Sequence, residues 1–218
     1  MLFRSHTPVS YSILYYNEQV QDDIMNLPAT LQARYIGLTN RMIMYGPNLG
    51  LPHTDSFGSG LFELRLKGAE GIARVFFCTL VRQEIVMLHS FIKKTQKDTG
   101  ERIKDRERTH EGAKEMTAQK KTKMLTHKQM VAKMLKKPAV KAAVKELDRT
   151  EFVILDEILA ARKAAGLTQA QVARKMRTQT PAIARLESSL ATGKHSPSLA
   201  TLKKYAAALG KRIELHLV

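Results

Sequence analysis

The chain has 218 residues, of which 44% are apolar, and this length and composition allow one large domain or two small ones with hydrophobic cores. We expect a cytoplasmic protein without membrane contact, because no apolar run approaches the ~20 residues that span a bilayer and "MLFRSHTPVSYSILYY" lacks a secretory signal layout. The single cysteine, Cys78, lies in the apolar stretch "RVFFCTLV" and is interpreted as a core residue.

The formal net charge of +16 is unevenly placed. Residues 1–92 carry 7 Lys and Arg against 7 Asp and Glu, residues 93–149 carry 18 against 8, and residues 150–218 carry 11 against 5. The local balances are therefore 0, +10 and +6. A basic chain without a membrane signal typically binds nucleic acid, because Lys and Arg release counterions from phosphates. The alternative is a solubilising basic linker.

The first 97 residues predict a small α+β domain. The β-rich stretch "YSILYYN" is followed by apolar residues at helical spacing over 18–27 and 29–45. The stretch "YGPNLGLPHTDSFGSG" collects Gly and Pro and predicts a loop. Three stretches separated by short turns, "LFELRLK", "IARVFFCTLV" and "EIVMLHSFIK", then predict an antiparallel meander. We expect two helices packed on one face of a curled antiparallel sheet.

Basic residues alternate with apolar ones on these strands. "LFELRLKG" places Glu63, Arg65 and Lys67 on one face by period two, which predicts a wet, cationic side. A meander would gather cations for phosphates and an imidazole for proton transfer, namely Arg65, Lys67, Arg74, His89 and Lys93, while Phe91 would stack a base. Taken singly, a basic residue on a strand is more often part of a solvated face, and a lone histidine is more often structural.

The amino-acid sequence of this segment resembles a known toxin family. "YYNEQVQDDIMNLP", "GLFELRLKG", "ARVFF" and "VMLHSFIKKTQK", within residues 11–97, are similar to the RelE/HigB superfamily of ribosome-dependent mRNA interferases, particularly its phage-derived HigB-like branch. The resemblance implies that a 2′-hydroxyl of ribosome-bound mRNA attacks the neighbouring phosphate without a metal or cofactor. It assigns charge stabilisation to Arg65 and Arg74, acid or base chemistry to His89, and RNA binding to Lys67, Lys93 and Lys94.

The composition changes after residue 97. Residues 98–127 are rich in Lys, Glu, Arg, Thr and Gln and predict a basic linker, in which "EMTAQKKTKMLTHKQM" looks like the start of a second protein. Residues 128–218 predict an all-helical domain, with helices at 128–135, 139–147, 151–165, 168–176, 181–188 and 198–209 before a short terminal strand in "KRIELHLV". The apolar stripe of residues 130–147 either packs inside this domain or covers a partner, since periodicity does not reveal what a stripe faces.

The stretch "LTQAQVARKMRTQTPAIARLE", residues 167–187, has the layout of a helix-turn-helix. Apolar residues recur on both helices, and Ala173 is small where the helices would cross. The stretch resembles the phage-repressor-like class of antitoxin and transcription-factor domains, in which Ile183, Arg185 and Glu187 hold matching positions. The alternative is a helical pair that merely packs.

Two residues depart from that class, and the resemblance assigns the DNA contacts. Arg177 stands where the class prefers Gly, which would strain the arginine if its φ is positive. Pro181, near the first turn of the recognition helix, removes a donor. The residues implied in DNA binding are Gln169 and Arg177 for phosphates, Gln179, Thr180 and Ala182 for base edges, and Arg185 for the backbone or a base.

The order of the two segments is that of HigBA modules, with a HigB-like toxin domain at 1–97 and a HigA-like antitoxin domain at 128–218. The sequence therefore predicts a toxin–antitoxin fusion with three kinds of partner: operator DNA, ribosome-bound mRNA, and the other half within the same or another chain. We also expect a homodimer through the C-terminal domain. The alternatives are a DNA-binding regulator whose N-terminal module is noncatalytic, and an RNA-binding protein that leaves transcripts intact.

Overall fold

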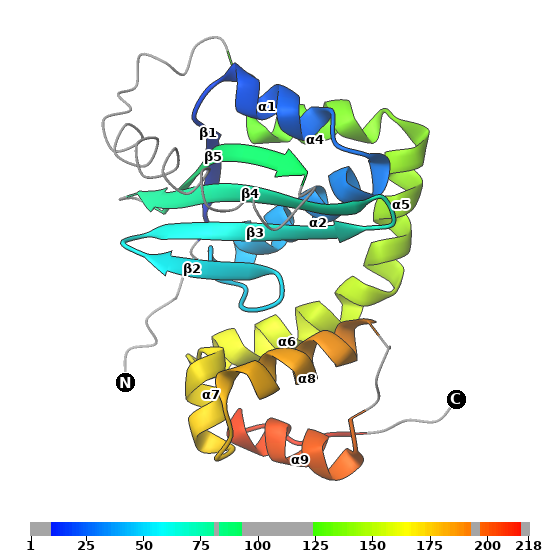
Figure 1. Ribbon diagram of the computed structural model, residues 1–218. Coiled ribbons are helices and arrows are strands. Elements are labelled where there is room, and N and C mark those ends of the chain that lie inside the picture. The colour runs from blue at the N-terminus through cyan, green and yellow to red at the C-terminus, as the bar shows by residue number, and fades with distance from the viewer. Residues whose placement is uncertain (1–9, 81–82, 93–123, 193–196, 215–218) are drawn as a thin grey trace, which may run out of the picture. The chain divides into compact units, whose positions relative to one another are not determined.

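The chain divides into two compact units (Figure 1). The computed structural model describes residues 10–80, 83–92, 124–192 and 197–214. The first unit comprises Met1–Asn48 and His53–Lys145, and the second comprises Leu49–Pro52 and Glu146–Val218. Within the described residues, no helix is both long enough and apolar enough to cross a membrane.

The first unit contains a five-stranded sheet with the order β1-β5-β4-β3-β2. Its strands are β1 (Ser12–Tyr15), β2 (Thr54–Gly58), β3 (Leu61–Gly68), β4 (Gly71–Leu80) and β5 (Glu84–Ile92). Strands β3 to β5 form the predicted antiparallel meander, and β2 adds to it antiparallel to β3. Strand β1 pairs with β5 in parallel. The expectation of an all-antiparallel sheet is thus wrong for β1, because this strand is not joined to β5 by a hairpin and its direction is set by the longer intervening chain.

Strand β2 lies within the stretch that the sequence predicted as a loop. It is an edge strand of five residues, "TDSFG", and three of them are exposed. A short edge strand buries little apolar surface, so it lacks the alternation by which β3 and β4 were predicted.

Two helices of the first unit pack against this sheet, α1 (Glu18–Met25) on β5 and α2 (Ala29–Tyr45) on β3. The Asn17 side chain caps α1 by accepting a 3.0 Å hydrogen bond from the backbone N–H of Val20. The apolar residues that predicted α2 from their spacing are all fully buried: Leu31, Tyr35, Leu38 and Met42.

Helix α4 (His127–Leu135) also belongs to the first unit, as does most of α5 (Pro138–Arg149). A capping box between Thr126 and Gln129 starts α4, which packs against α1. Met130 and Met134 have no exposed surface, and Val140 is 1% exposed. The sequence left open whether the apolar stripe packs inside the helical domain or covers a partner. In the structure, this part of the stripe is buried within the first unit.

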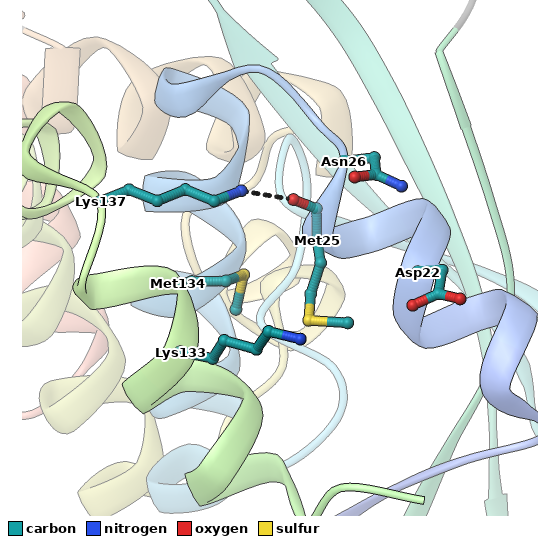
Figure 2. A pocket seen from close by; sticks show the side chains of 6 residues that line it. All are labelled: Asp22, Met25, Asn26, Lys133, Met134 and Lys137. Carbon is teal, nitrogen blue, oxygen red and sulfur yellow. Dashed lines mark hydrogen bonds between the residues drawn. The ribbon is translucent and has the colours of Figure 1, made fainter.

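Polar contacts hold α4 and the residues around it in place. The amide of Gln21 donates to the carbonyl of Leu125 at 2.6 Å and accepts from its N–H at 3.2 Å. At the other end, Lys137 donates to the carbonyl of Met25 at 2.8 Å, beside a pocket of about 160 Å³ between α1 and α4 (Figure 2). The seam is therefore fixed at both ends by bonds that span more than a hundred residues of sequence.

A buried aromatic cluster lies at the start of α4. The Tyr15 hydroxyl is 2.7 Å from Nδ1 of His127 and 2.9 Å from the Tyr35 hydroxyl. The Nε2 atom of His127 is buried and has no hydrogen-bond partner among the described residues. Burial lowers the pKa of His127 to about 4, because the charged imidazole would lose its hydration without gaining a compensating charge.

The second unit is helical, with α6 (Glu151–Ala165), α7 (Gln169–Lys175), α8 (Thr180–Thr192) and α9 (Leu199–Ala208). Its core cluster consists of Val172, Ala173, Ile183, Leu186, Tyr205 and Leu209. Gly166 ends α6 in the left-handed conformation at φ 63°, which glycine adopts without steric cost. Residues 211–214 do not form the predicted terminal strand, and the rest of that stretch, 215–218, lies outside the described residues.

We predict that the docking of α4 weakens on acidification and that His127→Phe removes this sensitivity. The fold favours neutral His127, so its contribution is complete above the unfolded pKa of about 6.5 and is lost as the pH falls towards the folded value of about 4. Between about pH 7.5 and 5, local stability at α4 should fall by about 2 kcal/mol more in the parent than in the Phe variant. Hydrogen exchange of the α4 amides measures this difference, and equal losses in both proteins would contradict the assignment.

Candidate functional site

The sheet of the first unit brings several of the predicted catalytic residues onto one face. Arg65 lies opposite Arg74 in the register of β3 and β4. Arg74 lies opposite Phe91, and Phe76 lies opposite His89, in the register of β4 and β5. Because directly paired residues point to the same side of a sheet, these side chains share one surface. Lys67, which was predicted to lie on the same face of its strand as Glu63 and Arg65, is exposed further along β3.

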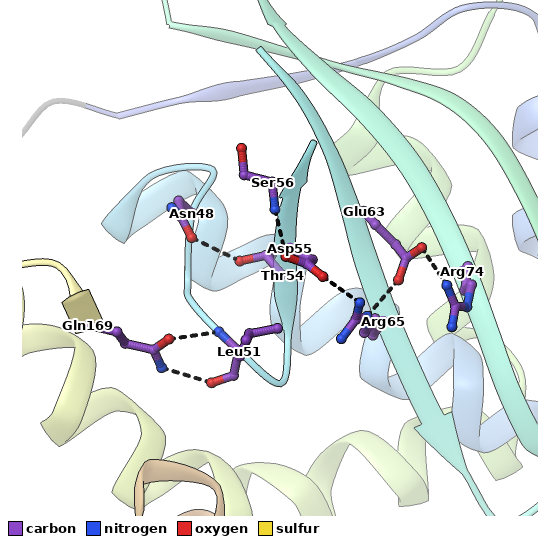
Figure 3. A network of polar contacts seen from close by, with 9 residues as sticks. All are labelled: Asn48, Leu51, Thr54, Asp55, Ser56, Glu63, Arg65, Arg74 and Gln169. Atoms are coloured by element: carbon purple, nitrogen blue, oxygen red, sulfur yellow. Dashed lines mark hydrogen bonds and ion pairs between the residues drawn. The ribbon is translucent and has the colours of Figure 1, made fainter. Parts of the chain in front are cut away.

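The two arginines on this face are paired with carboxylates (Figure 3). Glu63 has no exposed surface and accepts from Nε of Arg65 at 2.6 Å and from Nη1 of Arg74 at 2.7 Å. Nη2 of Arg65 also reaches Asp55 on β2 at 2.5 Å. Two cations therefore balance two carboxylates, and the strand alternation that predicted a cationic side did not reveal this pairing. Asp55 was missed because it lies in the stretch predicted as a loop.

Aromatic rings pack beside this ion-pair network. Phe91 is 8% exposed, and its ring stacks on Phe76 with centroids 5.8 Å apart. The His89 ring lies 5.7 Å from Phe91 on the same face. Phe57 on β2 is 47% exposed and lies 6.1 Å from Phe76, so it offers more aromatic surface than Phe91 does. Sequence reasoning missed Phe57 for the same reason that it missed Asp55. The predicted RNA-binding residues Lys93 and Lys94 lie outside the described residues.

The second unit contains the helix-turn-helix as α7, a turn and α8. Thr168 and Gln171 form a capping box at the start of α7. After α7, the N–H of Thr178 bonds to the carbonyl of Ala173 at 2.9 Å, and Arg177 adopts a φ of 54°. We expected a positive φ at this position to strain the arginine, and the φ of Arg177 in the structure is positive. Pro181 is the second residue of α8, where the first N–H groups of a helix lack intrahelical partners.

The residues predicted to face DNA cluster in the turn and in the first half of α8. Arg177, Gln179 and Arg185 are exposed, and Thr180 and Ala182 are half-buried. These residues thus lie just before, and in the first half of, the helix that enters the major groove in helix-turn-helix proteins.

Gln169 differs from this group because it is buried, with 6% of its surface exposed. Its Nε2 donates to Glu187 at 2.6 Å and to the carbonyl of Leu51 at 2.8 Å. Its Oε1 accepts from the N–H of Leu51 at 3.0 Å (Figure 3). The glutamine predicted to bind a phosphate is thus fully engaged inside the second unit.

Glu187 is the centre of this buried polar cluster and is 4% exposed. Besides Gln169, it accepts from the Tyr205 hydroxyl at 2.6 Å and pairs with Nε of Arg162 at 3.1 Å. Burial first, and the Glu187 charge second, raise the pKa of Tyr205, which keeps its hydroxyl protonated as a donor. Sequence reasoning noted Glu187 only as a matching position, and no local signal joined it to Arg162 or Tyr205.

We predict that Arg177→Gly stabilises the second unit by about 1 kcal/mol relative to Arg177→Ala. Both variants remove the charge, but only glycine relieves the left-handed backbone at φ 54°. Hydrogen exchange of the α7 and α8 amides, recorded as the temperature rises, measures the difference in stability. An alanine variant as stable as the glycine variant would show that the turn is not strained.

Comparison with known families matches each part of the chain separately. Residues 22–110 match the model of the family "Phage derived protein Gp49-like", and residues 158–215 match a helix-turn-helix family model. No curated protein matches the chain. The chain therefore carries an N-terminal Gp49-like domain, which is of a RelE-related, toxin-like kind, followed by a C-terminal helix-turn-helix domain of the DNA-binding type.

Proposed function

We propose that this chain is a toxin–antitoxin fusion of the HigB/HigA kind. Its N-terminal part is a ribosome-dependent mRNA endoribonuclease, and its C-terminal part neutralises that activity and represses its own promoter by binding operator DNA. The observation that carries the proposal is the order of the two matched domains, toxin-like at 22–110 and helix-turn-helix at 158–215.

The packing of α4 supports the neutralising role. This helix begins within the internal start-like segment, and it lies against α1 of the toxin-like unit with Met130 and Met134 fully buried. Burying two such side chains contributes several kcal/mol, because each removes apolar area from water. A neutralising contact made through α1 would need no separate partner, because α4 is part of the same chain.

The proposed chemistry is metal-independent transfer of a phosphodiester within the RNA strand. A base takes the proton of a 2′-hydroxyl, the 2′-oxygen bonds to the adjacent phosphorus, and the bond to the 5′-oxygen breaks as that oxygen gains a proton. His89 serves as the acid or base, and Arg65 and Arg74 stabilise the charge that develops on the phosphate. Lys67, Lys93, Lys94 and Phe91 bind the RNA.

DNA recognition in this proposal uses α8. Gln179, Thr180 and Ala182 face base edges, while Arg177, Arg185 and Gln169 contact the backbone. The exposure of Arg177, Gln179 and Arg185 supports this assignment. A homodimer formed through the C-terminal part would place two such helices on a palindromic operator.

One observation favours a second candidate function, a DNA-binding regulator with a noncatalytic N-terminal module. Glu63 is fully buried and forms ion pairs with both Arg65 and Arg74, and Asp55 forms a second ion pair with Arg65. An arginine that is already paired offers less charge to a phosphate. The two candidates differ in whether the N-terminal part cleaves RNA.

We predict that expression of residues 1–97 alone stops growth, and that co-expression of residues 116–218 restores it. Arg74→Ala in residues 1–97 should lower mRNA cleavage on ribosomes by roughly 10²–10³-fold, since one charge stabiliser supplies about 3–4 kcal/mol to a transition state. Arg34→Ala on α2 is the matched control and should cleave at the parental rate. Circular dichroism must show that Arg74→Ala is folded, because this variant removes one partner of the buried Glu63. Cleavage is measured by mapping the ends of ribosome-bound transcripts.

Two results would decide against the enzyme. Residues 1–97 that are folded by circular dichroism and yet leave transcripts intact would favour the noncatalytic module. Cleavage that persists unchanged in Arg74→Ala would mean that the catalytic site lies elsewhere on the domain.

We further predict that replacing Gln179 and Thr180 with Ala abolishes preference for the promoter of the chain's own gene. Each lost base contact costs about 1–3 kcal/mol, whereas contacts to phosphates are independent of sequence. In a gel-shift titration, promoter affinity should fall to that for a mixed-sequence duplex, which itself should stay at the parental value. An unchanged ratio of the two affinities would exclude these side chains from base recognition.

A further inference from the structure

The segment Leu49–Pro52 groups with the second unit, although its neighbours on both sides in the sequence belong to the first. Leu49 is anchored there, with 1% of its surface exposed, and its carbonyl accepts from Nη2 of Arg162 at 2.6 Å. Leu51 exchanges two hydrogen bonds with the side-chain amide of Gln169, at 3.0 and 2.8 Å. Backbone of this short segment is thus bound by two buried polar side chains of the helical unit.

The geometry leaves Gln169 no spare donor. A glutamine amide has two N–H donors, and here one goes to the Leu51 carbonyl and the other to Glu187. A DNA phosphate is an acceptor only, so Gln169 can bind it only after one of these bonds breaks. The bond to Glu187 is buried and charge-assisted, which makes the bond to Leu51 the one that gives way.

Gly50 shows that the segment is fitted closely to Gln169. A Cβ at this position would lie 2.7 Å from Cδ of Gln169 and 2.8 Å from its Nε2, closer than side-chain contacts allow. Its φ of 89° also requires glycine. Only a segment with glycine between the two leucines can bring its backbone against this glutamine.

We propose that Arg162 and Gln169 form a binding site for an extended leucine-containing backbone segment, occupied by Leu49–Pro52, and that this segment competes with the DNA backbone for Gln169. This inference rests on the proposed DNA-binding function of the second unit. The first helix of a helix-turn-helix crosses the DNA backbone, and Gln169 begins that helix. Seating of the segment therefore lowers the fraction of chains that can bind DNA, and the apparent dissociation constant equals the intrinsic constant divided by that fraction.

The test compares Gly50→Ala with Gly58→Ala in the full chain. Both glycines have nearly the same φ, 89° and 87°, but a Cβ at Gly58 meets no atom within 4 Å. Backbone strain is thus matched, and only Gly50→Ala pushes the segment away from Gln169. Binding to a mixed-sequence DNA duplex is followed by fluorescence anisotropy, because phosphate contacts do not depend on sequence.

Gly50→Ala should bind the duplex about tenfold more tightly than the parent, while Gly58→Ala binds as the parent does. Adding Gln169→Ala to Gly50→Ala should remove the gain. If the parent and Gly50→Ala bind equally well, the competition does not exist, although DNA binding itself stands. If neither binds DNA, the proposed function of the second unit fails and the competition fails with it.

A second measurement covers the case in which Gly50→Ala unfolds. Hydrogen exchange of the Leu51 amide in the parent, with and without saturating duplex, reports directly on the bond to Gln169. DNA should accelerate this exchange by at least about tenfold, as the segment leaves its site. Exchange that stays constant or slows in the presence of DNA would overturn the proposal.

Discussion

A buried carboxylate must be matched by donors, and in each unit one glutamate imposes this condition. Leaving an ionised group unpaired in an apolar interior costs far more than a fold can spare, so the surrounding chain is arranged to supply partners. Glu63 draws Arg65 and Arg74 together on one face of the sheet. Glu187, on α8, draws in Arg162, Gln169 and Tyr205 from the three other helices of its unit. The arrangement of the sheet arginines and that of the Arg162 and Gln169 side chains both follow from these two glutamates.

The two arginines of the sheet differ in how deeply their ion pairs are buried. Arg74 and Glu63 are 15% and 0% exposed, and breaking this pair would strand a buried charge. Arg65 and Asp55 are 32% and 37% exposed, and such a pair contributes about 1 kcal/mol or less because water screens it. In the proposed enzyme, Arg65 would exchange Asp55 for an RNA phosphate at little cost, whereas Arg74 would act from a fixed position. Pairing with carboxylates thus preorganises the arginines without removing both from phosphate chemistry.

The spacing of apolar residues predicted helices and strands well where one face of the element is buried. It did not predict which other elements that buried face contacts. The helices at 29–45 and 151–165 have the bounds expected from apolar spacing, and α7 and α8 lie close to theirs. The edge strand β2, the parallel pairing of β1 and the partners of Glu187 were not predictable in this way. Each depends on residues far apart in the chain, and neither alternation nor helical spacing carries that information. What the apolar stripe of α4 faces was left open for the same reason.

That location bears on why the chain contains a second start-like segment. The end of this segment and the residues after it form α4, whose two buried methionines complete the first unit instead of opening an independent domain. In two separate proteins, the same surfaces would have to meet by diffusion, and inhibition would depend on the concentration of the partner. Joined in one chain, the covering helix is present at an effective concentration of order mM, so moderate affinity suffices for near-complete coverage. The apolar seam between α1 and α4 therefore does not need the strength of an interface between separate proteins, and a few buried side chains with polar contacts at each end are enough to hold it.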